Sequence, residues 1–153
     1  MWIYIIYMKY FLILVFFSIY KVSICQEYII EHQMSFDEKI FTLKDKSIFS
    51  IINASGVWKD SNADFGPVEC RGVREANKNK KLLNLNVVCE QMNATGDKLW
   101  LRAIRNTDVD GGVGIWKILD GTGKFAIYKD YECTYAVSFA SNVYYVKANC
   151  KNK

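Results

Sequence analysis

The alternation of apolar and polar side chains is clearest near the C-terminus, in the two segments that flank Ser141 and Asn142. If these segments form an antiparallel hairpin with its turn there, Cys133 lies directly opposite Cys150. The same register makes one face apolar on both strands, with the pairs Tyr135 and Ala148, Val137 and Val146, and Phe139 and Tyr144. The other face carries Glu132, Thr134, Ser138, Lys147 and Asn149. This period of two predicts a hairpin with one buried face.

A second hairpin is predicted between Cys70 and Cys89, because their midpoint falls in the turn-like pair Asn79 and Lys80. The second strand alternates, with one face made of Leu83, Leu85, Val87 and Cys89. The first strand fits less well, because the charged side chain of Arg74 then lies opposite an apolar residue.

Other short runs of β-branched and aromatic residues are separated by turn signals rich in Asp, Asn, Ser and Gly. No segment of the chain after the N-terminus shows a sustained helical period. Short strands at this spacing predict an all-β domain, a small antiparallel meander of about eight strands. We expect the meander to close into a barrel, because closure removes exposed strand edges. The runs before the final hairpin are 39–43, 47–52, 56–59, 68–74, 82–90, 99–105 and 115–119.

The N-terminal segment has a different pattern. Lys9 precedes an apolar run from Tyr10 to Tyr20, and the small residues Ser23 and Cys25 follow at the −3 and −1 positions of a cleavage site. These are the charged, apolar and small-residue regions of a secretory signal peptide. We predict that residues 1–25 form a signal helix that is removed. Residues 26–153 then form a single β-barrel domain that is secreted or periplasmic.

Two alternatives to cleavage remain. Counted from Met1, the apolar stretch approaches the length of an uncleaved membrane anchor, although Lys9 interrupts it. The segment Val22–Cys25 also resembles a bacterial lipobox, although Ile24 stands where that motif has a small residue. We favour cleavage and release over an anchor or a lipoprotein.

Export changes the charge balance only slightly. The formal net charge of the chain is +4, and residues 1–25 contain Lys9 and Lys21 but no acidic residue, so the mature chain carries +2. This charge is too mild to indicate binding to nucleic acid or, after signal cleavage, to a membrane. The basic cluster at 78–81 is interpreted as a solvated turn.

Export also leaves an even set of four cysteines, because Cys25 is removed with the signal peptide. Four cysteines allow three pairings, and we expect disulfides in an oxidising compartment. The hairpin registers favour Cys133–Cys150 and, from a weaker pattern, Cys70–Cys89. Isolated cysteines and the lone His32 do not form a zinc site, so no metal ion is expected.

The segment Gly112–Ala126 carries the most specific motif, Gly-x-Gly-x-Trp followed by Gly-Thr-Gly-Lys-Phe. It resembles a pattern in small exported β-barrel proteins of largely unknown function, which are similar to the allene oxide cyclase and dirigent barrels. This chain departs from the pattern at Ile127, where the family has glycine, and at Asn93, where it has an acidic residue. The resemblance implies a barrel fold and allows an isomerase or cyclase activity inside it. The motif residues are Trp116, Gly121, Thr122, Gly123, Lys124 and Phe125.

The same motif has a physical interpretation. Gly121 and Gly123 give the backbone freedom at a tight turn, Trp116 and Phe125 anchor the strands on either side, and Lys124 is solvated.

Two other chemical motifs fail on spacing. Gly121–Lys124 resembles a phosphate-binding loop, but Ile118 stands where that motif needs glycine. Asp108–Gly111 resembles a calcium loop, but Leu119 stands where an EF-hand has its closing glutamate. We therefore expect no cofactor and interpret 108–111 as an acidic turn, in preference to a weaker calcium site that is not of the EF-hand type.

The single histidine, two possible glycosylation sites and three tryptophans give no clear indication of function. His32 is expected to be a surface histidine in an irregular N-terminal segment, because the sequence suggests no triad partners for it. Asn53 and Asn93 begin acceptor triplets for N-glycosylation, which matter only if the source organism glycosylates through that pathway. Core packing is favoured over a ligand cavity for the three tryptophans of the strand-like segments, Trp58, Trp100 and Trp116.

No set of catalytic residues is evident. We therefore expect a non-enzymatic module that holds a small apolar ligand inside the barrel or presents its surface to a partner. A cavity of a few hundred cubic ångströms would favour the ligand, and a packed interior would exclude it. The alternative is an isomerase or cyclase, which needs buried polar residues; the candidates are Arg74, Glu69, Glu132 and Tyr135. A structural or host-directed secreted factor is a third reading that the sequence does not test.

Overall fold

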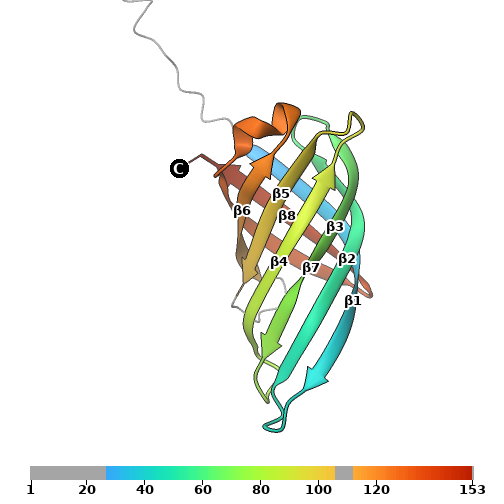
Figure 1. Cartoon of the computed structure of the whole chain (residues 1–153), viewed down its shortest axis with the longest axis vertical. Coiled ribbons are helices and arrows are strands. Elements are labelled where there is room, and N and C mark those ends of the chain that lie inside the picture. Colours follow the sequence, from blue (N-terminus) through green and yellow to red (C-terminus); the bar gives the residue numbers. More distant parts are fainter. Residues whose placement is uncertain (1–26, 106–111, 153) are drawn as a thin grey trace, which may run out of the picture.

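The protein is an all-β, eight-stranded antiparallel barrel (Figure 1), seen in a computed structural model that describes residues 27–105 and 112–152. Each strand pairs with the next, and β8 returns to pair with β1 and closes the barrel. This confirms the predicted fold class. The predicted signal helix and the acidic turn 108–111 lie outside the described residues. The strands are β1 (Tyr28–Thr42), β2 (Ile48–Asp60), β3 (Phe65–Ala76), β4 (Leu82–Met92), β5 (Lys98–Arg105), β6 (Val113–Gly121), β7 (Glu132–Ala140) and β8 (Val143–Lys151).

The registers of the two cysteine hairpins are those that the sequence predicts. Cys133 lies opposite Cys150 between β7 and β8, and Cys70 lies opposite Cys89 between β3 and β4. Both pairs form disulfides, with sulfur–sulfur distances of 2.00 and 2.04 Å respectively. The weaker alternation around Arg74 therefore does not mark a wrong register: Arg74 does lie opposite Leu85.

The N-terminal part of the barrel differs from the prediction in two ways. The segment around His32, interpreted as irregular, belongs to the long strand β1, and the predicted short strands at 47–52 and 56–59 are the single strand β2. Residues Tyr28, Ile30, His32 and Met34 alternate on the inner face of β1. A polar histidine within that series disguises the period of two, which explains the error.

A register shift lies at the lower end of the β3–β4 hairpin, between Glu75 and Ala76. Ala76 pairs with Leu82, so Leu82 is buried and Leu83 is exposed. The prediction that Leu83 shares the inner face with Leu85 is therefore wrong, because a bulge changes which side chain points inward.

In the half of the barrel drawn uppermost in Figure 1, large side chains are packed into the interior. A 3-10 helix, η1 (Gly123–Tyr128), lies across this end and carries the buried ring of Phe125 inward. The Phe125 ring packs edge-on against Trp58 at 5.7 Å between centroids, and Tyr128 stacks on Tyr28 at 3.8 Å. Phe125 thus belongs to a helical plug, and the prediction that it anchors a strand is wrong.

The Gly-Thr-Gly-Lys-Phe motif holds this plug in place. The backbone N–H of Thr122 donates to the carbonyl oxygen of Lys98 at 2.8 Å, and the Thr122 hydroxyl oxygen accepts from the Lys98 N–H at 2.7 Å. Gly123 has a φ of +51°, and a Cβ there would lie 1.9 Å from an Asp97 carboxylate oxygen. Lys124 forms an ion pair with Asp64 at 2.5 Å, so it is tethered although half exposed. The motif therefore closes one end of the barrel.

Candidate functional site

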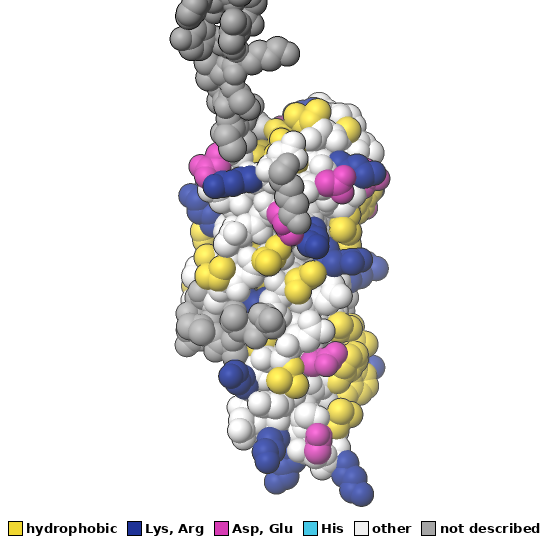
Figure 2. Space-filling view, turned by 90° about the vertical axis from the view of Figure 1, so that its left-hand side faces the viewer, with side chains coloured by type: hydrophobic (Ala, Val, Ile, Leu, Met, Phe, Trp, Pro, Cys, Tyr) yellow, Lys and Arg dark blue, Asp and Glu magenta, His cyan; other side chains and the backbone are white. Residues whose placement is uncertain are grey.

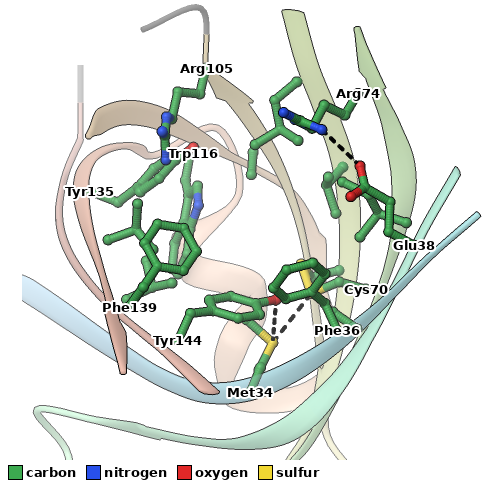
Figure 3. Close-up of a pocket in the computed structure, with 18 of the residues that line it drawn as sticks. Met34, Phe36, Glu38, Cys70, Arg74, Arg105, Trp116, Tyr135, Phe139 and Tyr144 are labelled. Carbon is green, nitrogen blue, oxygen red and sulfur yellow. Dashed lines mark hydrogen bonds and ion pairs between the residues drawn. A yellow bond between two sulfur atoms is a disulfide. The ribbon is translucent and has the colours of Figure 1, made fainter. Parts of the chain in front are cut away.

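The lower half of the barrel contains a cavity of about 380 Å³ that opens at the end opposite η1 (Figure 3). Most of the side chains that line it are apolar or aromatic. The walls are formed by Met34, Phe36, Glu38, Ile52, Ala54, Cys70, Arg74, Leu82, Leu85, Val87, Cys89, Ala103, Arg105, Trp116, Tyr135, Val137, Phe139, Tyr144 and Val146. Each of the eight strands contributes at least one of these residues, so the cavity is an unfilled part of the barrel interior.

The hollow follows from the size of the side chains on the walls. Ala54 and Ala103 are inward-facing positions that larger residues occupy elsewhere in the core. Trp116 lies at the inner end of the cavity, where its ring packs against Tyr135 at 5.3 Å and against His32 at 4.6 Å between centroids. Above this layer the barrel is packed, so the cavity ends there.

The mouth of the cavity is lined by aromatic rings from β1, β7 and β8 (Figure 3). Tyr144 lies 5.8 Å from Phe36 and 6.3 Å from Phe139 between ring centroids. The Tyr144 hydroxyl donates to the sulfur of Met34 at 3.6 Å. Phe36 and Phe139 remain largely exposed, which is costly for large apolar rings unless something covers them.

One polar pair lies on the opposite wall, where Arg74 forms an ion pair with Glu38 at 3.1 Å (Figure 3). The Ser50 hydroxyl donates to the same carboxylate oxygen of Glu38. A guanidinium group has five N–H donors, and Glu38 takes one Nη1 contact. The wall therefore offers further donors to a polar group on a ligand.

A second polar position lies near Trp116. Burial raises the pKa of Tyr135 to about 12, with the nearby positive charge of Arg105 opposing the shift, so Tyr135 is neutral at physiological pH. Its hydroxyl has no hydrogen-bond partner within residues 27–105 and 112–152. Gly114 leaves room for the ring, because a Cβ there would lie 2.4 Å from the Tyr135 Cζ atom. The first part of the sequence motif thus shapes the cavity.

A buried polar pair separates the cavity from the packed half. His32 is 0% exposed, and its Nε2 donates to the Gln91 Oε1 at 2.5 Å. Burial lowers the pKa of His32 to about 4, although the hydrogen bond to Gln91 opposes this shift, so the ring is neutral at pH 7. The interpretation of His32 as a surface residue is therefore wrong.

The structure separates the residues that the sequence singled out. Cys70, Cys89 and Trp116 border the cavity, whereas Cys133 and Cys150 lie in the packed half. The remaining motif residues, Gly121, Thr122, Gly123, Lys124 and Phe125, form the closed end. Trp58 is buried, but Trp100 lies on the outer surface and donates through Nε1 to Glu90 at 2.8 Å.

Of the four polar candidates for an enzyme, two reach the cavity. Arg74 and Tyr135 line it, as described. Glu69 is exposed and pairs with Arg71 on the outer face, and Glu132 pairs with Lys117 there at 3.9 Å. Glu38, Met34 and Phe36 were missed, although an inward series at every second residue of β1 would have found them.

The two glycosylation candidates have different surroundings. Asn53 is exposed on the outer face of β2. Asn93 is buried, and its side-chain oxygen accepts from the backbone N–H groups of Thr95 and Asp97. Modification at either position stays a prediction, with Asn53 the accessible one.

No group of three or more His, Cys, Asp or Glu side chains within the described residues is arranged to hold a metal ion. Comparison with known proteins gives no match to a family model, to a curated protein or to a solved structure. The two disulfides are consistent with an extracellular or otherwise oxidising compartment.

Proposed function

We propose that this protein is an exported, non-enzymatic binding protein that holds a small apolar ligand in the open half of its barrel. The observation that carries the proposal is the cavity of about 380 Å³, lined mainly by apolar and aromatic side chains and open at one end. Pockets for small ligands typically have about 300–1,000 Å³ and a predominantly apolar lining with a few polar groups. Both properties are present here.

The polar groups indicate how such a ligand is oriented. The Glu38–Arg74 pair lies toward the mouth, whereas Trp116 lies at the inner end. An apolar body would therefore enter first and pack against Trp116. A hydroxyl, carbonyl or carboxylate at its trailing end would accept a hydrogen bond from Arg74.

Binding is tested with N-phenyl-1-naphthylamine, a neutral apolar dye whose fluorescence rises in a dry environment. We expect saturable binding to the unmodified protein. Ala103→Phe places a ring in the cavity, because Ala103 faces inward, and should reduce the affinity at least tenfold. Ile104→Phe adds a ring on the outer face of the same strand and is the matched control.

The control should bind the dye as the unmodified protein does. Equal dye binding by both variants would show that the dye sits elsewhere and would contradict the proposal. Native mass spectrometry of the protein purified from its own source gives an independent reading, since a bound compound adds its mass to the chain.

An isomerase or cyclase is the second candidate, favoured by the position of Glu38, Arg74 and Tyr135 on the cavity wall. Its test is the chemical fate of a compound recovered from the cavity. Conversion to an isomer that stops in the double variant Glu38→Leu, Arg74→Leu would establish an enzyme. The double change avoids leaving one buried charge unpaired. Recovery of the compound unchanged supports a binding protein.

A further inference from the structure

The two hairpins β1–β2 and β3–β4 reach farther from η1 than the β7–β8 hairpin does (Figure 1), and we call their projecting ends the lip. Their strands have 15, 13, 12 and 11 residues, whereas the four strands β5 to β8 have eight or nine. Ile48 pairs with Ala76, so the turns at 43–47 and 77–81 lie next to each other at the tip. The lip therefore places these two turns farthest from the packed half.

The tip of the lip is basic. The two turns contain five exposed lysines and one aspartate, and these lysines form no ion pair within the part of the chain that the structure describes. Figure 2 shows Lys and Arg side chains gathered at this lower tip. The lysines are Lys44, Lys46, Lys78, Lys80 and Lys81, and the aspartate is Asp45.

The opposite end of the barrel has the reverse balance. Its described turns and several residues that flank them carry the carboxylates of Asp60, Asp64, Asp97, Asp120 and Asp130 against Lys98, Lys124 and Lys129. The small net charge of the chain therefore hides a separation of charge along the barrel axis. A charge averaged over the sequence does not reveal such a polarity.

Large apolar side chains are exposed among the lysines of the lip. Ile40, Phe41, Leu43 and Leu83 are 54, 42, 53 and 53% exposed; they lie at the end of β1, in the first turn and at the start of β4, all within the two hairpins of the lip. A single exposed leucine needs no explanation, but several at one tip mark an interaction surface. Lysines beside exposed Leu, Ile and Phe form the combination found on proteins that lie at the surface of anionic membranes.

We propose that the lip docks on an anionic lipid surface, with the lysines facing the head groups and Ile40, Phe41, Leu43 and Leu83 entering the outer part of the acyl region. A nucleic acid would match the lysines but not the apolar side chains between them, because its backbone is charged and its bases are read by stacking or hydrogen bonds. The expectation of no membrane contact after signal cleavage rests on the net charge, which the charge separation makes a poor guide. This docking does not depend on the proposed ligand.

Vesicle flotation of the purified protein tests the proposal. The probes are vesicles of phosphatidylcholine alone and vesicles with 30% phosphatidylglycerol, at an ionic strength of about 0.1 M. We expect binding to the anionic vesicles only. The lip variant Lys44→Gln, Lys46→Asn, Lys78→Gln, Lys80→Asn should lower it at least fiftyfold, since each lysine near such a surface contributes about fivefold. Asn is used at 46 and 80 because both positions have positive φ, which Asn tolerates.

The matched control removes the same number of charges elsewhere, with Lys117→Gln, Lys129→Gln, Lys147→Gln and Lys151→Gln. It should keep most of the binding. A second variant, Leu43→Ser with Leu83→Ser, keeps all charges and should lower binding at least tenfold. Equal losses in the lip and control variants, or equal binding to both kinds of vesicle, would overturn the proposal.

Two further readouts separate the outcomes. Binding to an anionic polymer such as heparin without binding to vesicles would point to a different partner and would also overturn the proposal. Dye binding in the cavity should be unchanged in the lip variant, because none of the four lysines lines the cavity. In the unmodified protein, dye binding without vesicle binding would contradict the docking proposal, and vesicle binding without dye binding would contradict the ligand proposal.

Discussion

The two halves of the barrel are built from the same eight strands, yet one is solid and the other is hollow. The half under η1 is filled by Trp58, Phe125, Leu101 and their neighbours, and the lower half leaves about 380 Å³ unfilled. Each half contains one disulfide across a hairpin of similar length, with sequence separations of 17 and 19 residues. The comparison indicates that packing in one half stabilises the fold, so that the other half can remain hollow.

The largest expected losses of stability come from removing the disulfides, one in each half of the barrel. In the loop-entropy model, removal of either one costs about 3 kcal/mol, because the closed loops are nearly equal. Replacing Cys133 and Cys150 with Ala should cost about 1–2 kcal/mol more than replacing Cys70 and Cys89, since only the first pair leaves a void in packed surroundings. Urea denaturation at pH 7 measures both free energies of unfolding. Equal losses would show that the two halves are packed alike.

A matched pair of leucines tests packing without changing the chain connectivity. Leu101 is fully buried in the packed half, and Leu85 is half-buried on the cavity wall. Leu101→Ala should lower the free energy of unfolding by about 3 kcal/mol, and Leu85→Ala by about 1 kcal/mol. The same denaturation experiment applies. A larger loss at Leu85 would mean that the cavity is filled or collapsed in solution.

The buried His32, at the boundary between the two halves, should make the free energy of unfolding depend on pH. The pKa of His32 is about 4 in the folded chain, so the unfolded chain, with a histidine pKa near 6.5, binds more protons between these values. The stability that comes from the buried neutral His32 is therefore present at pH 7 and is lost as the pH decreases through this window. Between pH 7 and 5 the expected loss is about 2 kcal/mol.

The control for this prediction is His32→Gln, which removes the titrating group and should flatten the pH profile over the same range. The pKa of Glu31 is lowered from 4.5 to about 2, chiefly by its hydrogen bond with Lys59, so its own contribution to stability is lost mainly below pH 5, and the comparison is made between pH 7 and 5. A profile that is as steep in the variant as in the unmodified protein would assign the effect to other groups.

The smallest expected effect is at the surface of the closed end. Lys124→Gln removes the ion pair with Asp64, but the lysine is half exposed, so the loss should stay below about 1 kcal/mol. Thermal unfolding detects such a change as a shift of a few degrees. A much larger shift would show that this ion pair, and not the apolar plug, holds the end closed.

Much of the fold was predictable because the alternation of apolar and polar residues along a strand indicates the register of each hairpin. Cys133 and Cys150 identify one register together with three apolar pairs, and Cys70 with Cys89 identifies another. These registers, with several further short strands, are enough to predict an antiparallel barrel. The start of β1 was missed because His32 occupies an inward position, and burial of a polar residue depends on a partner, Gln91, that lies 59 residues away.

The candidate site was less predictable than the fold. Whether the interior is hollow depends on which side chains meet across the barrel, and the sequence does not show that Ala54 and Ala103 face the same space. The bulge after Glu75 exchanges the faces of Leu82 and Leu83, and no local signal marks it. The motif from Trp116 to Phe125 stands out in the sequence. That its last residues form a plug depends on the short helix η1, which was not among the predicted elements.

The plug formed by η1 affects how the contents of the cavity would exchange with the surroundings. Among the described residues the cavity is closed at the end under η1, so its contents enter and leave at the opposite end and the fold itself provides no direction of transport. Direction would come from where the mouth faces and from the concentration on that side. The residence time of a ligand would then be set at the rim, by Phe36, Phe139 and Tyr144, and substitutions there should change rates of exchange more than affinity.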